Sequence, residues 1–77
     1  MATVTVQSNK NILTVGKKKD GTYSFRLKDT LGGDYKMVMH SPDEVFCAAH
    51  EMADNNDIGR ELSRKIHLVW DKIEVNK

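Results

Sequence analysis

The sequence predicts a single α+β domain, residues 1–77, built as an antiparallel meander of three to four strands with two helices packed on one face. Three observations support this fold class. Apolar and polar residues alternate over residues 23–28 and again over 35–40, as they do in strands with one buried face. Short segments rich in Gly, Asn and Asp separate the apolar stretches before residue 41. After residue 41 the apolar residues recur at helical spacing instead.

Four strands are expected in the amino-terminal half. The β-branched residues of 3–6 and 12–15 predict the first two strands, with turn-forming residues between them. Asp20-Gly21 predicts a hairpin before the third strand, residues 22–28, because both residues tolerate a positive φ. Gly32 and Gly33 predict a loop before the fourth strand, residues 35–40.

Two helices are expected in the carboxy-terminal half. Ser41 is a predicted N-cap, Pro42 suits the first helical position, and Glu44 completes a capping box, so the first helix runs from here to about residue 54. Asp57 is the predicted cap of a second helix, since apolar residues recur at helical spacing from 58 to 73. A final strand within residues 66–75 is the alternative, because residues 66–70 are rich in strand formers.

These elements divide the side chains into a core and an open sheet face. The predicted core comprises Leu13, Val15, Tyr23, Phe25, Leu27, Met37, Met39, Val45, Phe46, Ala49, Met52, Ile58, Leu62, Ile66 and Trp70. One face of an antiparallel sheet is commonly exposed to solvent. That face is expected to display Thr14, Ser24, Arg26, Lys28, Lys36, Val38 and His40.

Composition narrows the class of protein. The chain is 39% apolar and 30% charged, which is ordinary for a globular domain. The sequence has no apolar run of bilayer-spanning or signal-peptide length, so we expect a cytoplasmic protein that does not enter a membrane. The single cysteine, Cys47, excludes an internal disulfide.

Charge is distributed unevenly along the chain. Residues 1–40 hold seven Lys or Arg against three Asp, a net charge of +4, whereas residues 41–77 carry −3. Cationic side chains neutralise phosphates and release counterions. We therefore expect a non-catalytic module that contacts nucleic acid through its open sheet face and a lysine-rich hairpin tip. The candidate contact residues are Lys17, Lys18, Lys19, Arg26, Lys28 and Lys36.

One stretch of the sequence resembles a known family. Lys19-Asp20-Gly21, Tyr23, Phe25-Arg26, Gly32-Gly33 and then Ser41-Pro42-Asp43-Glu44 resemble the small amino-terminal DNA-binding domain of tyrosine-type integrases, over residues 12–54. That family backs a three-stranded sheet with a helix and reads DNA with the sheet. The resemblance implies that Lys18, Lys19, Arg26, Lys28 and Lys36 lie at the contact. Asp43-Glu44 departs from the family's basic helix entry, and the chain continues into a second helix rather than a recombinase body.

Other functions have less support from the residues. Cys47 and His50 lie three positions apart, but structural zinc sites need four ligands, so neither a metal site nor a cofactor is expected. No catalytic residues are expected, since Gly32-Gly33 is not followed by the Lys-Ser/Thr of a phosphate loop. The basic face could instead serve only solubility.

A protein partner is the alternative to nucleic acid. Small inhibitors and adaptors of phage or mobile-element type act by covering a surface of another protein. The candidate apolar anchors for such a contact are Val38, Trp70, Ile73 and Val75, with a place in the core as the alternative for Trp70 and Ile73. The first strand could also pair, as a sheet edge, with a second copy to form a homodimer.

Overall fold

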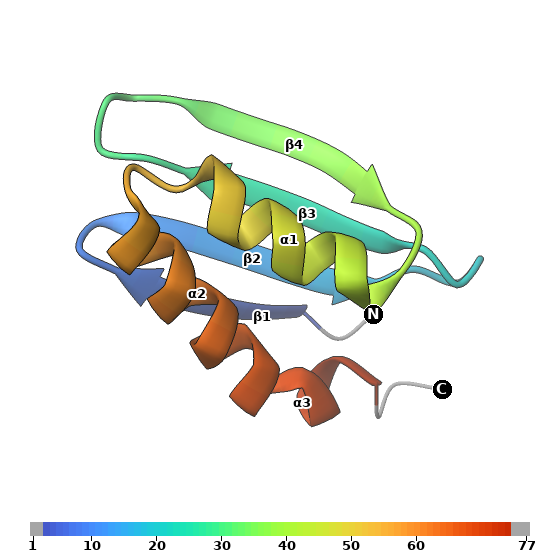
Figure 1. The fold of residues 1–77 in the computed structure, drawn as a ribbon. Helices are drawn as coiled ribbons and strands as arrows, with labels where there is room; N and C mark the ends of the chain where they lie inside the picture. Colours follow the sequence, from blue (N-terminus) through green and yellow to red (C-terminus); the bar gives the residue numbers. More distant parts are fainter. Residues whose placement is uncertain (1–2, 75–77) are drawn as a thin grey trace.

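The structure, a computed structural model, describes residues 3–74 and consists there of one four-stranded sheet followed by three helices (Figure 1). The strands lie in the order β1-β2-β3-β4, and each neighbouring pair is antiparallel, so the predicted meander is confirmed. The helices lie together on one side of the sheet. The elements are β1 (Thr3–Ser8), β2 (Asn11–Lys17), β3 (Tyr23–Lys28), β4 (Asp34–Met39), α1 (Pro42–Met52), α2 (Asn56–Leu68) and α3 (Trp70–Glu74).

Two tight turns set the register of the first three strands. Asn9 and Lys10 both have positive φ (46° and 71°), as a two-residue type I′ hairpin requires. The predicted hairpin before β3 is also confirmed, but only Gly21 adopts a positive φ there (89°). Asp20 instead accepts hydrogen bonds from the backbone N of Thr22 (2.9 Å) and from its Oγ1 (2.6 Å). These bonds hold the turn without straining the Asp20 backbone.

The two long helices begin at side-chain caps. Ser41 caps α1 as predicted, its Oγ accepting from the backbone N of Glu44. The predicted capping box is displaced by one residue: the Glu44 carboxylate accepts from the backbone N of His40 (2.7 Å), the residue before the cap. The predicted cap of α2 was wrong by two residues: Asn55, not Asp57, accepts from the backbone N of Ile58 (2.9 Å). Asp57 lies inside the first turn, where its negative charge interacts favourably with the positive end of the helix dipole.

The alternative of a final strand was wrong. Residues 66–68 belong to α2, which buries Ile58, Leu62 and Ile66 along one side, and residues 70–74 form α3. The chain leaves the helix at Val69 (φ −106°, ψ 11°) and turns into α3, which packs against β1 and β2. This change of direction buries Ile73 completely.

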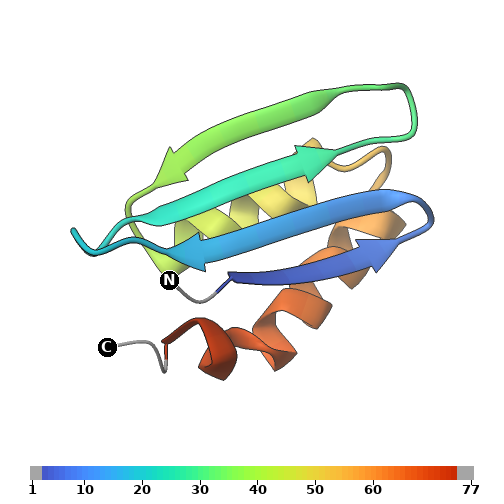
Figure 2. The same ribbon diagram turned by 180° about the vertical axis from the view of Figure 1, so that it is seen from behind.

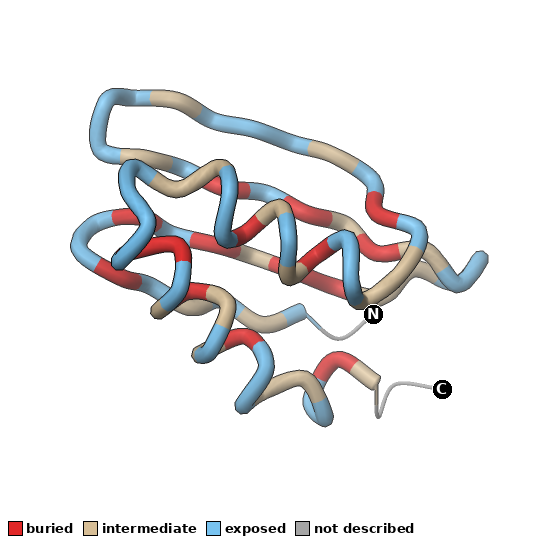
Figure 3. The backbone as a smooth tube through the Cα atoms, in the orientation of Figure 1, coloured by how far each residue is buried: buried red, intermediate tan, exposed pale blue. Residues whose placement is uncertain are grey.

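The core lies between the helices and one sheet face (Figure 3). Its buried apolar residues are Leu13, Val15, Tyr23, Phe25, Leu27, Met39, Val45, Ala49, Ile58, Leu62, Ile66 and Ile73. Four predicted core residues, Met37, Phe46, Met52 and Trp70, are only partly buried. Met37 lies on the edge strand β4 and has a neighbouring strand on one side only. Ile73, which the core list left out, was offered both as a core residue and as an anchor for a partner, and its complete burial confirms the core interpretation. Val75, another of the anchor candidates, lies outside the described residues.

The first two helices touch at a glycine. A Cβ atom placed on Gly59 of α2 would lie 2.2 Å from the carbonyl oxygen of His50 in α1. The backbones therefore approach more closely than any side chain allows, and this contact sets the position of α2 beside α1.

Candidate nucleic-acid interface

The candidate interface is the sheet face turned away from the helices. In the register, Arg26 of β3 lies between Thr14 of β2 and Lys36 of β4, and Lys28 lies between Ile12 and Asp34. Because neighbouring β3 residues Phe25 and Leu27 point into the core, Arg26 and Lys28 point to the other side. Figure 2 shows this side of the sheet with no part of residues 3–74 in front of it. Arg26, Lys28 and Lys36 thus share one uncovered surface.

The remaining residues of this open face are mainly neutral and polar. Alternation also places Thr3, Thr5 and Gln7 of β1 on this face, beside Gly16, Thr14 and Ile12 of β2. Thr5 Oγ1 lies 3.1 Å from Thr14 Oγ1. Three cations against one Asp give the face a net charge of +2. The cations are concentrated on β3 and β4, while hydroxyl groups occupy β1 and β2.

Asp34 is a residue of this open face that the sequence analysis did not single out. Arg26 Nε donates to Asp34 Oδ1 (3.0 Å) and Arg26 Nη2 donates to Oδ2 (2.9 Å), a two-point contact diagonal across β3 and β4. The pair uses two of the five N–H donors of the guanidinium and leaves three outside it. The signal that could have revealed this pair is the strand register. Lys36 is the direct partner of Arg26, and Asp34, two residues earlier on the same face, is its diagonal neighbour.

The three cations act together on this carboxylate. The pKa of Asp34 lies below its usual range, chiefly because Arg26 donates hydrogen bonds to it, with further lowering by the charges of Arg26, Lys36 and Lys28. The pKa of Arg26 is raised in return. Asp34 therefore stays ionised at neutral pH and offsets part of the positive potential of the open face.

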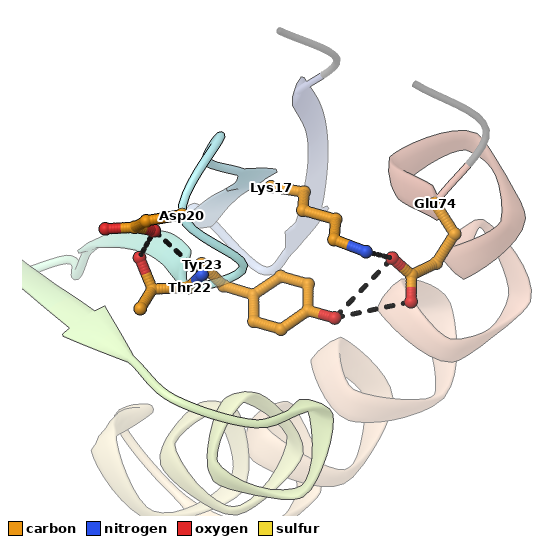
Figure 4. Close-up of polar contacts among 5 residues, drawn as sticks. All are labelled: Lys17, Asp20, Thr22, Tyr23 and Glu74. Atoms are coloured by element: carbon orange, nitrogen blue, oxygen red, sulfur yellow. Dashed lines mark hydrogen bonds and ion pairs between the residues drawn. The ribbon is translucent and has the colours of Figure 1, made fainter. Parts of the chain in front are cut away.

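Lys17 lies apart from the other predicted contact residues. It occupies the β2 position next to Tyr23, on the helix-covered side of the sheet, and its Nζ forms an ion pair with Glu74 of α3 (2.9 Å). Tyr23 Oη donates to the same carboxylate (3.3 Å), as Figure 4 shows. Lys18 and Lys19 follow in the β2–β3 turn, at the end of the sheet, where Lys19 is exposed. The candidate surface is thus Arg26, Lys28 and Lys36. Lys18 and Lys19 lie in the turn next to Tyr23, at the opposite end of β3 from Lys28, and Lys17 instead anchors α3.

This anchor should make stability depend on pH. The hydrogen bond from Lys17 lowers the pKa of Glu74 below its ordinary value of 4.5, so the anchor stabilises the fold above that value and is lost as the pH falls through the depressed pKa. We expect urea unfolding to show Glu74→Gln as less stable than wild type near neutral pH, and the difference to shrink in acid. A difference that stays constant through the acid transition would count against the anchor.

In alkali the same anchor should lose stability as the pH rises. Burial raises the pKa of Tyr23, and the hydrogen bond to Glu74 raises the pKa of Lys17. The stability that these two groups contribute is complete below their ordinary pKa values. It is lost as the pH rises through their raised pKa values in the folded protein. The Glu74→Gln variant should therefore also lose its difference from wild type in strong alkali.

Comparisons with known proteins identify no relative of this chain. Searches against protein-family models, curated proteins and solved structures found no significant match to this chain. Over residues 3–74, no helix has the length and hydropathy needed to cross a membrane. In the same residues, His, Cys, Asp and Glu side chains nowhere gather in threes as a metal site would require.

Proposed function

We propose that this protein is a non-catalytic nucleic-acid-binding module that contacts the phosphate backbone with its open sheet face. The observation that carries the proposal is the position of Arg26, Lys28 and Lys36 on one uncovered surface. All three are exposed, and their strands are packed on the core through Phe25 and Leu27 of β3 and Met39 of β4. Cations on a rigid sheet bind phosphates without ordering a flexible segment first.

The parts of the face have different roles in this proposal. Lys28 and Lys36 neutralise phosphates and release counterions. The hydroxyl groups of Thr5 and Thr14 are of the kind that hydrogen-bond to phosphate and sugar oxygens. Arg26 has three donors outside its pair with Asp34, and they are available for a phosphate or for a guanine edge.

In this proposal the turn lysines add a second group of cations to the contact. Lys18 and Lys19 lie at the end of the sheet, where they would contact phosphates beyond the strands. The resemblance to the amino-terminal domain of tyrosine-type integrases points to the same side of the molecule, since that family reads DNA with its sheet. This chain would act as a free-standing relative of such a domain.

A titration tests the proposal. We expect a fluorescein-labelled duplex of about 20 base pairs to bind at about 50 mM salt, and log K to fall with log [salt]. The slope should be about −3 to −5, since the open face has three cations and the turn has two more. Fluorescence anisotropy measures both quantities. Absence of binding at low salt would end the proposal.

Removing the acidic group from the face provides a sharper prediction. Asp34→Asn should bind the duplex several-fold more tightly, because it removes a charge that repels phosphate and releases the Arg26 guanidinium. The slope of log K against log [salt] should become more negative by about one, as for one additional phosphate contact. Asp71→Asn, at an exposed carboxylate of α3, makes the same charge change on the helix side and should have little effect. Equal gains in both variants, or none at Asp34, would show that the open face is not the contact.

A protein partner is the second candidate, and Asp34 favours it. An acidic side chain among cations, on the same strand face as the half-exposed Val38, is a mixture that protein surfaces match better than a uniform polyanion does. In this case the protein is an inhibitor or adaptor of the phage or mobile-element type. Capture of one specific protein from nuclease-treated lysate, together with no duplex binding at low salt, would favour it.

A homodimer through β1 must displace an existing bond. The two-residue turn directs the backbone groups of Ser8 and Asn11 toward each other, so those of Gln7 face the outer edge of β1. Lys65 Nζ of α2 already donates to the Gln7 carbonyl (2.7 Å). Pairing of β1 with a second copy would therefore require α2 to release this edge.

A further inference from the structure

A second surface lies in the helix layer, on the opposite side of the molecule from the open face. A hollow of about 410 Å³ opens between α1 and α2. Phe46 and His50 of α1 form one wall, and the other wall comes from α2. The residues of α2 that matter here are Arg60, Arg64, His67 and Leu68. We refer to this hollow as the α1–α2 groove.

The groove combines cations with apolar groups in a fixed order. Arg60, Arg64 and Leu68 follow each other at intervals of four residues, so they form one stripe along α2 with a rise of about 6 Å between neighbours. Both arginines are exposed, and Leu68 is 69% exposed, although it is a large apolar side chain. The ring of Phe46 lies 5.3 Å from that of His67 and 5.1 Å from that of Trp70, which holds it at the end of the groove.

We infer that the α1–α2 groove binds a short acidic amphipathic helix of a partner protein. Two carboxylates one turn apart on such a helix would accept two-point hydrogen bonds from Arg60 and Arg64. A bulky apolar side chain on the next turn would cover Leu68 and Phe46. Helices commonly dock into grooves in this way, with anchors at helical spacing. The inference does not depend on the proposed nucleic-acid contact, which uses the other side of the molecule.

Charge around the groove favours a peptide over a nucleic acid. Asp57 and Glu61 line the adjoining hollow together with the same two arginines. A continuous polyanion lying along α2 would meet these carboxylates and be repelled. A short helix needs only the two carboxylates that pair with the arginines, and its apolar side chain covers Phe46 and the exposed Leu68, for which a phosphate backbone has no matching group.

The test uses two synthetic peptides and the single tryptophan. Trp70 packs on Phe46, so its fluorescence reports occupation of the groove. The probe is a helical peptide of about 15 residues with Glu one turn apart and Leu on the following turn, and the control peptide has Gln in place of Glu. We expect the Glu peptide to bind, and the Gln peptide to bind at least about tenfold more weakly.

Variants locate the contact. Arg60→Ala/Arg64→Ala should lower the affinity for the Glu peptide at least about tenfold, and Leu68→Ala should lower it several-fold. Lys28→Ala/Lys36→Ala removes the same charge from the open face and should leave peptide binding unchanged. Urea midpoints establish that each variant is folded.

Three results would overturn the inference. They are the absence of binding, equal affinity for the Glu and Gln peptides, and equal weakening by the open-face variant. A DNA duplex that displaces the peptide in a way that requires Arg60 and Arg64 would assign the groove to nucleic acid instead.

Discussion

Gly59→Ala is expected to destabilise the protein by about 1–3 kcal/mol, although alanine is the better helix former. The added methyl group would lie 2.2 Å from the carbonyl oxygen of His50 and 2.9 Å from its carbonyl carbon. These are backbone atoms of α1, so no side-chain rotation relieves the clash. The two helices must separate, and separation exposes Ala49 and Ile58, which are buried beside the contact.

The sign of the effect makes this prediction decisive. In a helix without such a contact, the same substitution would stabilise by up to about 1 kcal/mol. Gly33→Ala is the matched control: its methyl group would meet side-chain atoms of Asp29 and Tyr35, which can move, so the loss should be smaller. Urea unfolding measures both variants. A Gly59→Ala variant as stable as wild type would contradict the close approach of α1 and α2.

The sequence predicted the sheet well because each local signal agreed with its neighbours. Alternation in β3 and β4 defined two faces, and the residues with the largest contrast, Phe25 and Arg26, occupy the sides expected of them. The first helix was equally clear, since cap, proline and acidic first turn coincide at Ser41–Glu44.

Long-range contacts were beyond sequence reasoning. The side chain of Asn11 is completely buried, and its Nδ2 donates to Asp54 (3.1 Å), 43 residues later. The pair of Lys17 with Glu74 likewise depends on the bend at Val69, which no local pattern indicates. Lys17 was therefore placed with the contact residues on charge alone, and Asp34 was overlooked because strand register, rather than composition, brings it to Arg26.

The double charge reversal Lys28→Glu/Lys36→Glu should reduce affinity for a DNA duplex about a hundredfold at about 50 mM salt, because counterion release makes each phosphate contact worth about tenfold at that salt concentration. The reversal removes two contacts and adds repulsion. Both side chains are exposed and point away from the core, so the fold should persist.

A helix-side variant provides the matched control. Arg60→Glu/Lys72→Glu changes the net charge by the same amount, at two exposed positions on α2 and α3. If only the total charge of the protein mattered, both double variants would lose affinity equally. If the open face is the contact, the helix-side variant should bind almost as well as wild type.

The most direct measurement is the slope of log K against log [salt] for wild type and these two double variants, titrated against the same duplex. We expect wild type and Arg60→Glu/Lys72→Glu to share one slope, and Lys28→Glu/Lys36→Glu to have a slope shallower by about two charges. Equal slopes in all three proteins, or the larger loss in the helix-side variant, would contradict binding through the open sheet face.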